Sequence, residues 1–82
     1  MLEDWVEEVS RALGIDADID VDQLLDVARV VAHKVERRAA PVTTYLMGVA
    51  IASSRGDTQG ADEVAAKVIA LARSWNGPPE GT

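Results

Sequence analysis

The chain of 82 residues contains no cysteine, and it has only one histidine and three aromatic residues. Without cysteine there is no disulfide framework, no thiolate nucleophile and no cysteine-based metal site. A single histidine also argues against a transition-metal site, which takes several nitrogen or sulfur ligands. The lack of cysteine fits a reducing compartment. We therefore expect no metal and no bound cofactor.

Basic residues are scarce as well, so the formal net charge is −6. Binding to free nucleic acid needs a basic surface, and the charge argues against nucleic acid and against an anionic membrane face as partners. The longest uncharged run, between Arg38 and Arg55, is too short and too polar to span a bilayer. The start, MLEDWVEEVS, lacks the basic segment of a signal peptide. We expect a cytoplasmic protein.

What the chain does have is aliphatic: its hydrophobic fraction of 48% consists mostly of alanine, valine and leucine. This mixture suits closely packed helices better than a sheet. The length leaves room for one domain with a thin core. Because such a chain does not easily hold both a deep substrate cleft and a full core, we expect a protein that is not an enzyme.

Apolar residues recur at helical spacing in four segments. The pattern predicts helices over residues 2–13, 21–37, 41–54 and 59–75. Gly14 is a natural stop for the first helix, Asp20 and Gln23 have the spacing of a capping box before the second, and Pro41 suits the first turn of the third. Four helices with short loops predict an all-α fold, a compact four-helix bundle, as one domain over residues 1–76 with a disordered tail over 77–82.

The apolar stripes also predict which residues are buried. The main stripe of the second helix is formed by Leu24, Ala28, Val31 and Val35. The third helix has almost no polar face, so we expect it to be the most buried, with Gly48 allowing another helix to approach closely. Trp5 and Trp75 are expected to close the bundle together.

An aspartate-rich loop precedes the second helix and resembles the start of a calcium-binding EF-hand loop. Its alternating acids are Asp16, Asp18, Asp20 and Asp22. The sixth and twelfth positions of such a loop would be Val21 and Val27 rather than glycine and glutamate. A solvated loop that ends in a helix cap explains the same residues.

The size, acidity and helix count resemble those of acyl carrier proteins. A carrier needs Asp-Ser-Leu at the start of its second helix, because the serine hydroxyl takes the phosphopantetheine arm. The corresponding residues 22–25 read DQLL and contain no serine. The carrier function therefore fails on its chemistry.

The second helix ends in a concentration of positive charge that is unusual in an acidic chain. Its members are Arg29, His33, Lys34, Arg37 and Arg38. Arg29, His33 and Arg37 are four residues apart and are predicted to share one helix face. Cations at the negative end of a helix dipole explain one or two of them, and an ordinary solvated face is the simpler alternative. If neither explanation accounts for the cluster, it is a binding surface.

Three residues follow this cluster at the start of the third helix. Pro41, Thr43 and Thr44 are predicted to lie in its first turn, where free N–H groups and hydroxyls could hold an anion or a partner's backbone. Local backbone hydrogen bonds are the alternative use of these hydroxyls. His33 as a general base is less supported, because no carboxylate is evidently assigned to it.

The run HKVERRAAPVTTYLMG over residues 33–48, together with Trp5 and the ALGI sequence over 12–15, resembles a small bacterial helical domain of unknown function. The resemblance extends from Leu2 to Trp75. Members of that family occur alone near formate dehydrogenase genes or fused C-terminally to molybdenum-cofactor guanylyltransferases. Arg38 stands where the related pattern has proline, which makes the cluster more basic.

Three functions remain open. The resemblance implies an accessory or small-subunit protein that binds a molybdenum-cofactor enzyme of the formate dehydrogenase type or its maturation machinery, through the basic cluster. The alternative is a domain that binds molybdopterin or a guanine dinucleotide and assists cofactor transfer, with His33 as acid–base and Arg37 as phosphate clamp. The third is a structural subunit that completes a homo-oligomer, with Trp5 and Trp75 as interface anchors.

Overall fold

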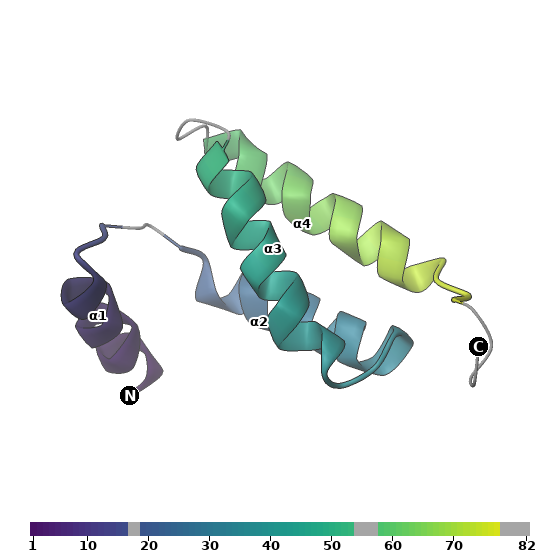
Figure 1. The fold of residues 1–82 in the computed structure, drawn as a ribbon, viewed down its shortest axis with the longest axis horizontal. Helices are drawn as coiled ribbons and strands as arrows, with labels where there is room; N and C mark the ends of the chain where they lie inside the picture. The colour runs from purple at the N-terminus through teal and green to yellow at the C-terminus, as the bar shows by residue number, and fades with distance from the viewer. Residues whose placement is uncertain (17–18, 54–57, 78–82) are drawn as a thin grey trace.

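The computed structural model describes residues 1–16, 19–53 and 58–77. These ranges contain the helices α1 (Leu2–Leu13), α2 (Val21–Lys34), α3 (Ala39–Ser53) and α4 (Thr58–Arg73) (Figure 1). The predicted all-α fold is confirmed, and each helix begins within two residues of its predicted start. The predicted tail lies outside the described residues from 78 onward.

Two of the predicted helix ends are made by the expected residues. Gly14 adopts a left-handed φ of 68° after α1, and its N–H donates to the carbonyl of Arg11 at 3.1 Å. At the start of α2 the Asp20 carboxylate accepts from the N–H of Gln23 at 3.0 Å. The side chain of Gln23 does not complete a capping box, because it donates instead to Asp62 of α4 at 3.0 Å.

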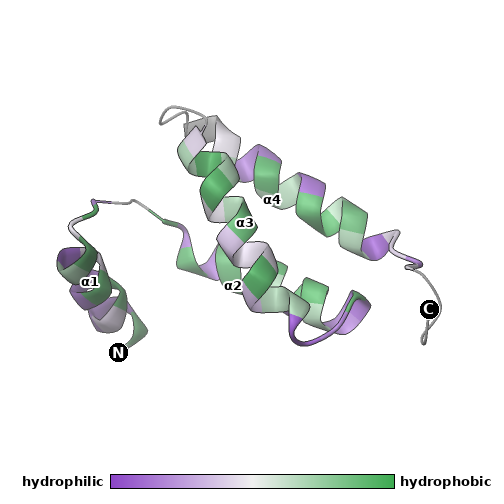
Figure 2. Cartoon of the chain, viewed as in Figure 1, coloured by the Kyte–Doolittle hydropathy of each residue, from purple (hydrophilic) through white to green (hydrophobic). Residues whose placement is uncertain are grey.

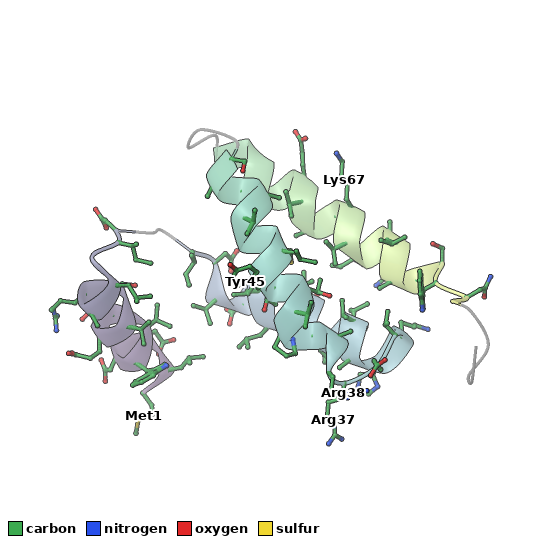
Figure 3. All side chains as sticks on the ribbon, viewed as in Figure 1. Met1, Arg37, Arg38, Tyr45 and Lys67 are labelled. Carbon is green, nitrogen blue, oxygen red and sulfur yellow. The ribbon has the colours of Figure 1, made fainter. Side chains whose placement is uncertain are left out.

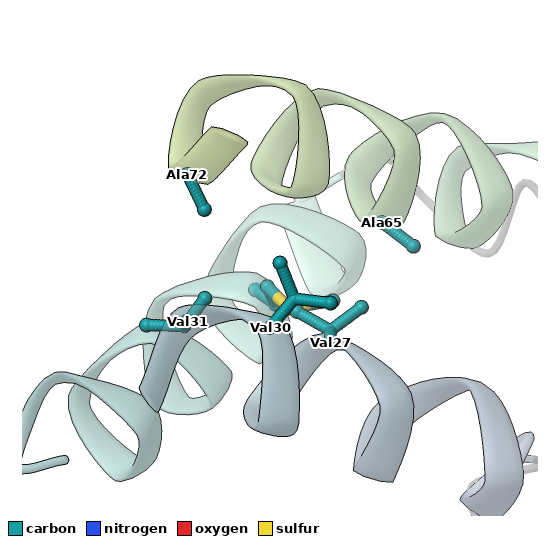
Figure 4. Packing of buried hydrophobic residues seen from close by; sticks show 6 residues of the cluster. Val27, Val30, Val31, Ala65 and Ala72 are labelled. Carbon is teal, nitrogen blue, oxygen red and sulfur yellow. The ribbon is translucent and has the colours of Figure 1, made fainter. Parts of the chain in front are cut away.

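Helices α2, α3 and α4 pack against one another and form the body of the molecule. The buried core consists of Val27, Val30, Val31, Met47, Ala65 and Ala72. Ala65 and Ala72 lie two turns apart on α4 and face the valines of α2 (Figure 4). Because alanine is small, α4 can approach the bulkier valines closely.

The buried stripe of α2 differs from the predicted one. Val31 is buried as predicted, but Leu24 and Ala28 are half-buried and Val35 is exposed. Val27, beside the predicted stripe, is fully buried. The reason is that α3 and α4 both pack on α2, so its most buried line lies between these two neighbours. Periodicity predicts a stripe, but the positions of α3 and α4 determine which residues lie at its centre.

Helix α3 is not the most buried helix, contrary to prediction. Only Met47 is buried among its described side chains, and Tyr45 next to it is 73% exposed. Apart from the helix itself, no atom of the described residues lies within 4 Å of where a Cβ on Gly48 would stand. The predicted close approach at Gly48 is therefore wrong. Two neighbouring helices, α2 and α4, are too few to surround α3, so one face stays open.

Helix α1 lies beyond the N-terminal end of α2 and, in the described part of the chain, packs against none of the other three helices (Figure 1). The radius of gyration is 14.0 Å, larger than the roughly 12 Å of a compact domain of this length. Trp5 is 65% exposed and Trp75 is 46% exposed. The expectation that these two residues close the bundle together is wrong.

Candidate binding surface

The turn between α2 and α3 carries the predicted cationic residues. Because α2 ends at Lys34, Arg37 and Arg38 lie in the turn rather than on the helix face predicted for Arg37. Arg37 and Arg38 project away from the helices (Figure 3). We use the name basic turn for His33, Lys34, Arg37 and Arg38. Arg29 lies one helical turn before His33, so these two residues share a face of α2 as predicted.

Some of these cations already have acidic neighbours. Arg29 pairs with Asp26, and Arg38 Nε lies 3.3 Å from Glu36 Oε1. Such exposed pairs contribute little to stability. His33, Lys34 and Arg37 are exposed and form no ion pair with any described residue. Three of the predicted cations are thus free to interact with a partner.

The start of α3 offers little to an anion. The N–H of Ala39 donates to the backbone carbonyl of Glu36 at 3.1 Å, and the N–H of Ala40 donates to the backbone carbonyl of Arg37 at 3.2 Å. Pro41 has no N–H. Thr43 and Thr44 are the fifth and sixth residues of α3, so their N–H groups face helical partners rather than solvent. Their predicted place in the first turn is therefore corrected.

The side chains of the two threonines have different surroundings. Thr44 donates its hydroxyl to the carbonyl of Pro41 at 3.0 Å, the local use that was the alternative to partner binding. Thr43 lines a groove between the helices. Pro41 itself is exposed at the beginning of α3. Of these three residues, Pro41 alone continues the surface of the basic turn.

An exposed apolar surface follows directly after the basic turn. We call it the α3 outer face, and its members are Val42, Tyr45, Leu46 and Val49. They lie at positions i, i+3, i+4 and i+7 and therefore on one side of the helix. Helix α3 has no charged residue between Ala39 and Ser53, and it is green to pale over its length in Figure 2. The third helix was predicted to be the most buried one, so the sequence did not predict that these residues form a surface.

Hollows lie between the described helices. One of them, here the apolar groove, has a volume of about 340 Å³ and is formed where α2 ends, α3 begins and α4 ends. Its lining residues are Val31, Val35, Thr43, Leu46, Met47, Ala50, Val64, Val68, Leu71, Ala72 and Trp75. A second hollow, of about 370 Å³, lies beside the Gln23–Asp62 hydrogen bond and includes Ile19 and Thr44.

Comparison with known families gives one match. The chain matches the family described as "Domain of unknown function (DUF6457)" over residues 1–80. The chain belongs to this family. The match confirms the resemblance to a small domain of unknown function. Comparison with curated proteins and with solved structures gives no match.

The described ionisable residues of this DUF6457 domain lie at its surface. Within the described ranges no charged side chain is buried, and no three His, Asp or Glu residues are grouped so that they could hold a metal ion. Asp18 of the aspartate-rich loop lies outside those ranges. None of the described helices is long and apolar enough to cross a membrane. The basic turn and the α3 outer face are thus the features that distinguish this surface.

Proposed function

We propose that the protein is a non-catalytic binding module that docks onto a molybdenum-cofactor enzyme of the formate dehydrogenase type, or onto its maturation machinery. The observation that carries the proposal is the continuity of the basic turn with the α3 outer face. Exposed arginine beside tyrosine and aliphatic side chains is typical of protein interfaces. The identity of the partner rests on the resemblance described above.

The partner surface is expected to be acidic with an apolar centre. Lys34 and Arg37, which form no ion pair with a described residue, would meet carboxylates of the partner. Tyr45 is 73% exposed and provides a rigid, amphipathic contact at low entropic cost. Charges of opposite sign at the rim speed association and fix orientation, and apolar burial supplies affinity.

The geometry gives less support to the alternative of a molybdopterin or guanine-dinucleotide site. Phosphates are usually held by free N–H groups at a helix N-terminus, and at α3 those of Ala39 and Ala40 are already bonded. The described residues also contain no buried cation to clamp a phosphate. A surface that recognises a protein fits these observations better.

The test is capture of the partner by tagged wild-type protein from its native cytoplasm, compared with two charge reversals. Arg37→Glu changes the basic turn, whereas Lys67→Glu makes the same change on α4, where Lys67 points away from that turn (Figure 3). We expect wild type and Lys67→Glu to retain a molybdopterin enzyme or its maturation factor, and Arg37→Glu to lose it.

Two results would count against the proposal. Equal capture by Arg37→Glu and Lys67→Glu would remove the basic turn from the interface. Failure of wild type to retain any molybdenum-cofactor protein would remove the partner class. A rise in melting temperature with saturating guanine dinucleotide would instead support the small-ligand alternative, because a ligand stabilises the state that it binds.

A further inference from the structure

Helix α1 has an apolar stripe that no other described helix covers. The stripe consists of Leu2, Trp5, Val6, Val9 and Leu13, at positions i, i+3, i+4, i+7 and i+11. No residue of α1 is buried, and α1 packs against no other described helix. The other residues of α1 include four acidic ones, and the purple segments of α1 in Figure 2 mark its hydrophilic residues. Such a helix has the pattern of one that lies in a hydrophobic groove.

The apolar groove of the body has a lining that is nearly as apolar as the stripe of α1. Among the residues that line the apolar groove only Thr43 is polar, and Leu46 and Leu71 are each at least 60% exposed. The lining runs along α4 from Val64 to Ala72, about 12 Å at the rise of an α-helix, and continues to Trp75 beyond the helix end at Arg73. The stripe from Leu2 to Leu13 is about 17 Å long. The groove is thus long enough to hold most of the stripe of α1.

We propose that α1 of a second copy of this chain occupies the apolar groove, and that the exchange is reciprocal. Each body would then gain a fourth helix and each α1 would bury its stripe. Trp5 is the anchor residue, since a large aromatic side chain in a dry pocket dominates many interfaces. Reciprocal exchange of one element is a low-cost route to a symmetric dimer. This inference does not depend on the proposed partner.

Charge favours the same arrangement. The first half of α1 carries Glu3, Asp4, Glu7 and Glu8. The groove lies at the end of the body where α2 and α4 finish, and those last turns carry Lys34 and Arg73. Neither cation has an ion pair with a described residue. Opposite charges of this kind would orient α1 with its acidic first turns at the basic end of the groove.

The position of α1 favours a second copy over the chain's own body. Hydrogen bonds fix Gly14 and Ile15 to the end of α1, and Asp20 caps α2. The link from Ile15 to Asp20 spans at most about 18 Å. In the structure α1 stands beyond the N-terminal end of α2 and contacts none of the other described helices, so the α1 of the same chain leaves the groove uncovered (Figure 1).

The size of the contact suits a stable dimer. Each copy would contribute five stripe residues and the eleven residues that line the groove. With flanking charged residues this approaches the roughly 20 residues per side of standard interfaces. Because the exchange is symmetric, each helix-in-groove contact occurs twice.

The experiment is sedimentation or light scattering of the full chain over a range of concentrations. We expect wild type to be dimeric at micromolar concentration. Trp5→Glu in the stripe and Leu71→Glu in the groove should each raise the dimer dissociation constant at least about tenfold, which corresponds to the loss of one anchor. Leu25→Glu is the control, because Leu25 is exposed but belongs to neither surface. Circular dichroism verifies that each variant is folded.

Mixing the two variants distinguishes exchange from other dimers. Trp5→Glu keeps an intact groove and Leu71→Glu keeps an intact α1, so an equimolar mixture should form heterodimers through one restored contact. A wild type that is monomeric at all concentrations, including one in which α1 closes on its own body, would overturn the proposal. A dimer that Trp5→Glu leaves intact would overturn it as well.

Discussion

Helix α1 and the body of α2–α4 both have apolar stripes, but the body buries its stripes and α1 does not. Both contain amphipathic helices whose apolar stripes need cover. In the body, valines of α2 meet alanines of α4 and the stripes disappear into a core. In α1 the stripe is as regular, yet no residue of it is buried. Periodicity shows that a helix needs a neighbour, but it does not show which neighbour, or in which molecule.

The largest expected effect on stability comes from a substitution in the core of the body. Val27→Asp places a charge without a partner at the one fully buried side chain and should destabilise the fold by more than about 4 kcal/mol. On the same helix, Leu25→Asp changes an exposed residue and should cost less than about 1 kcal/mol. Denaturant titration followed by circular dichroism measures both. Similar losses in the two variants would contradict the assignment of the core.

A second pair of substitutions tests α3, whose buried side chain is Met47. Met47→Ala should cost about 2–5 kcal/mol, because it removes a buried side chain and leaves a cavity. Tyr45→Ala, two residues earlier and exposed, should change the free energy of unfolding by about 0.5 kcal/mol or less. The same titration compares them. A large loss from Tyr45→Ala would mean that the outer face is covered in solution.

Two glycines sharpen the comparison between α1 and the body. Gly14→Ala forces alanine into a left-handed conformation and should weaken the end of α1 by roughly 1–2 kcal/mol. Gly48→Ala meets open space inside α3 and should stabilise the body by up to about 1 kcal/mol. Amide hydrogen exchange under conditions that keep the chain monomeric reports each helix separately. If Gly14→Ala also loosened α2–α4, the two regions would not be independent.

The smallest expected effect concerns the junction of the two regions. Asp20→Ala removes the side-chain cap of Gln23 N–H and should cost about 1 kcal/mol. Asp16→Ala removes the same charge from a residue that makes no hydrogen bond with the described part of the chain, and it should have no measurable effect. Thermal unfolding distinguishes the two. Equal melting temperatures for both variants would show that the cap contributes nothing.

Local features of the structure were largely predictable. The Asp20 cap, the Gly14 stop and Pro41 near the start of α3 follow from backbone hydrogen bonds and backbone conformation, which depend on a few adjacent residues. The end of α2 was placed three residues too late. A basic helical pattern continues to Arg37, but the chain turns at Val35 to begin α3.

The candidate site was only partly predictable. The cations of the basic turn were found from their local concentration, and their exposure agrees with that choice. The α3 outer face was missed, since an uncharged helix is usually surrounded by neighbours. Its exposure depends on where α2 and α4 lie, which composition does not contain. The threonines were misplaced because α3 begins two residues earlier than predicted.

By itself, the sequence determined four helices, two of their ends and the place of the positive charge, because each depends on contacts within a few residues. Tertiary structure alone decided that Val27 rather than Leu24 is the centre of the α2 stripe, that α3 keeps an open face, and that α1 stands away from the body. These outcomes depend on how many neighbours a short chain can supply to each helix. With three packed helices, this chain leaves apolar surface uncovered on α1, on α3 and in the groove between α3 and α4.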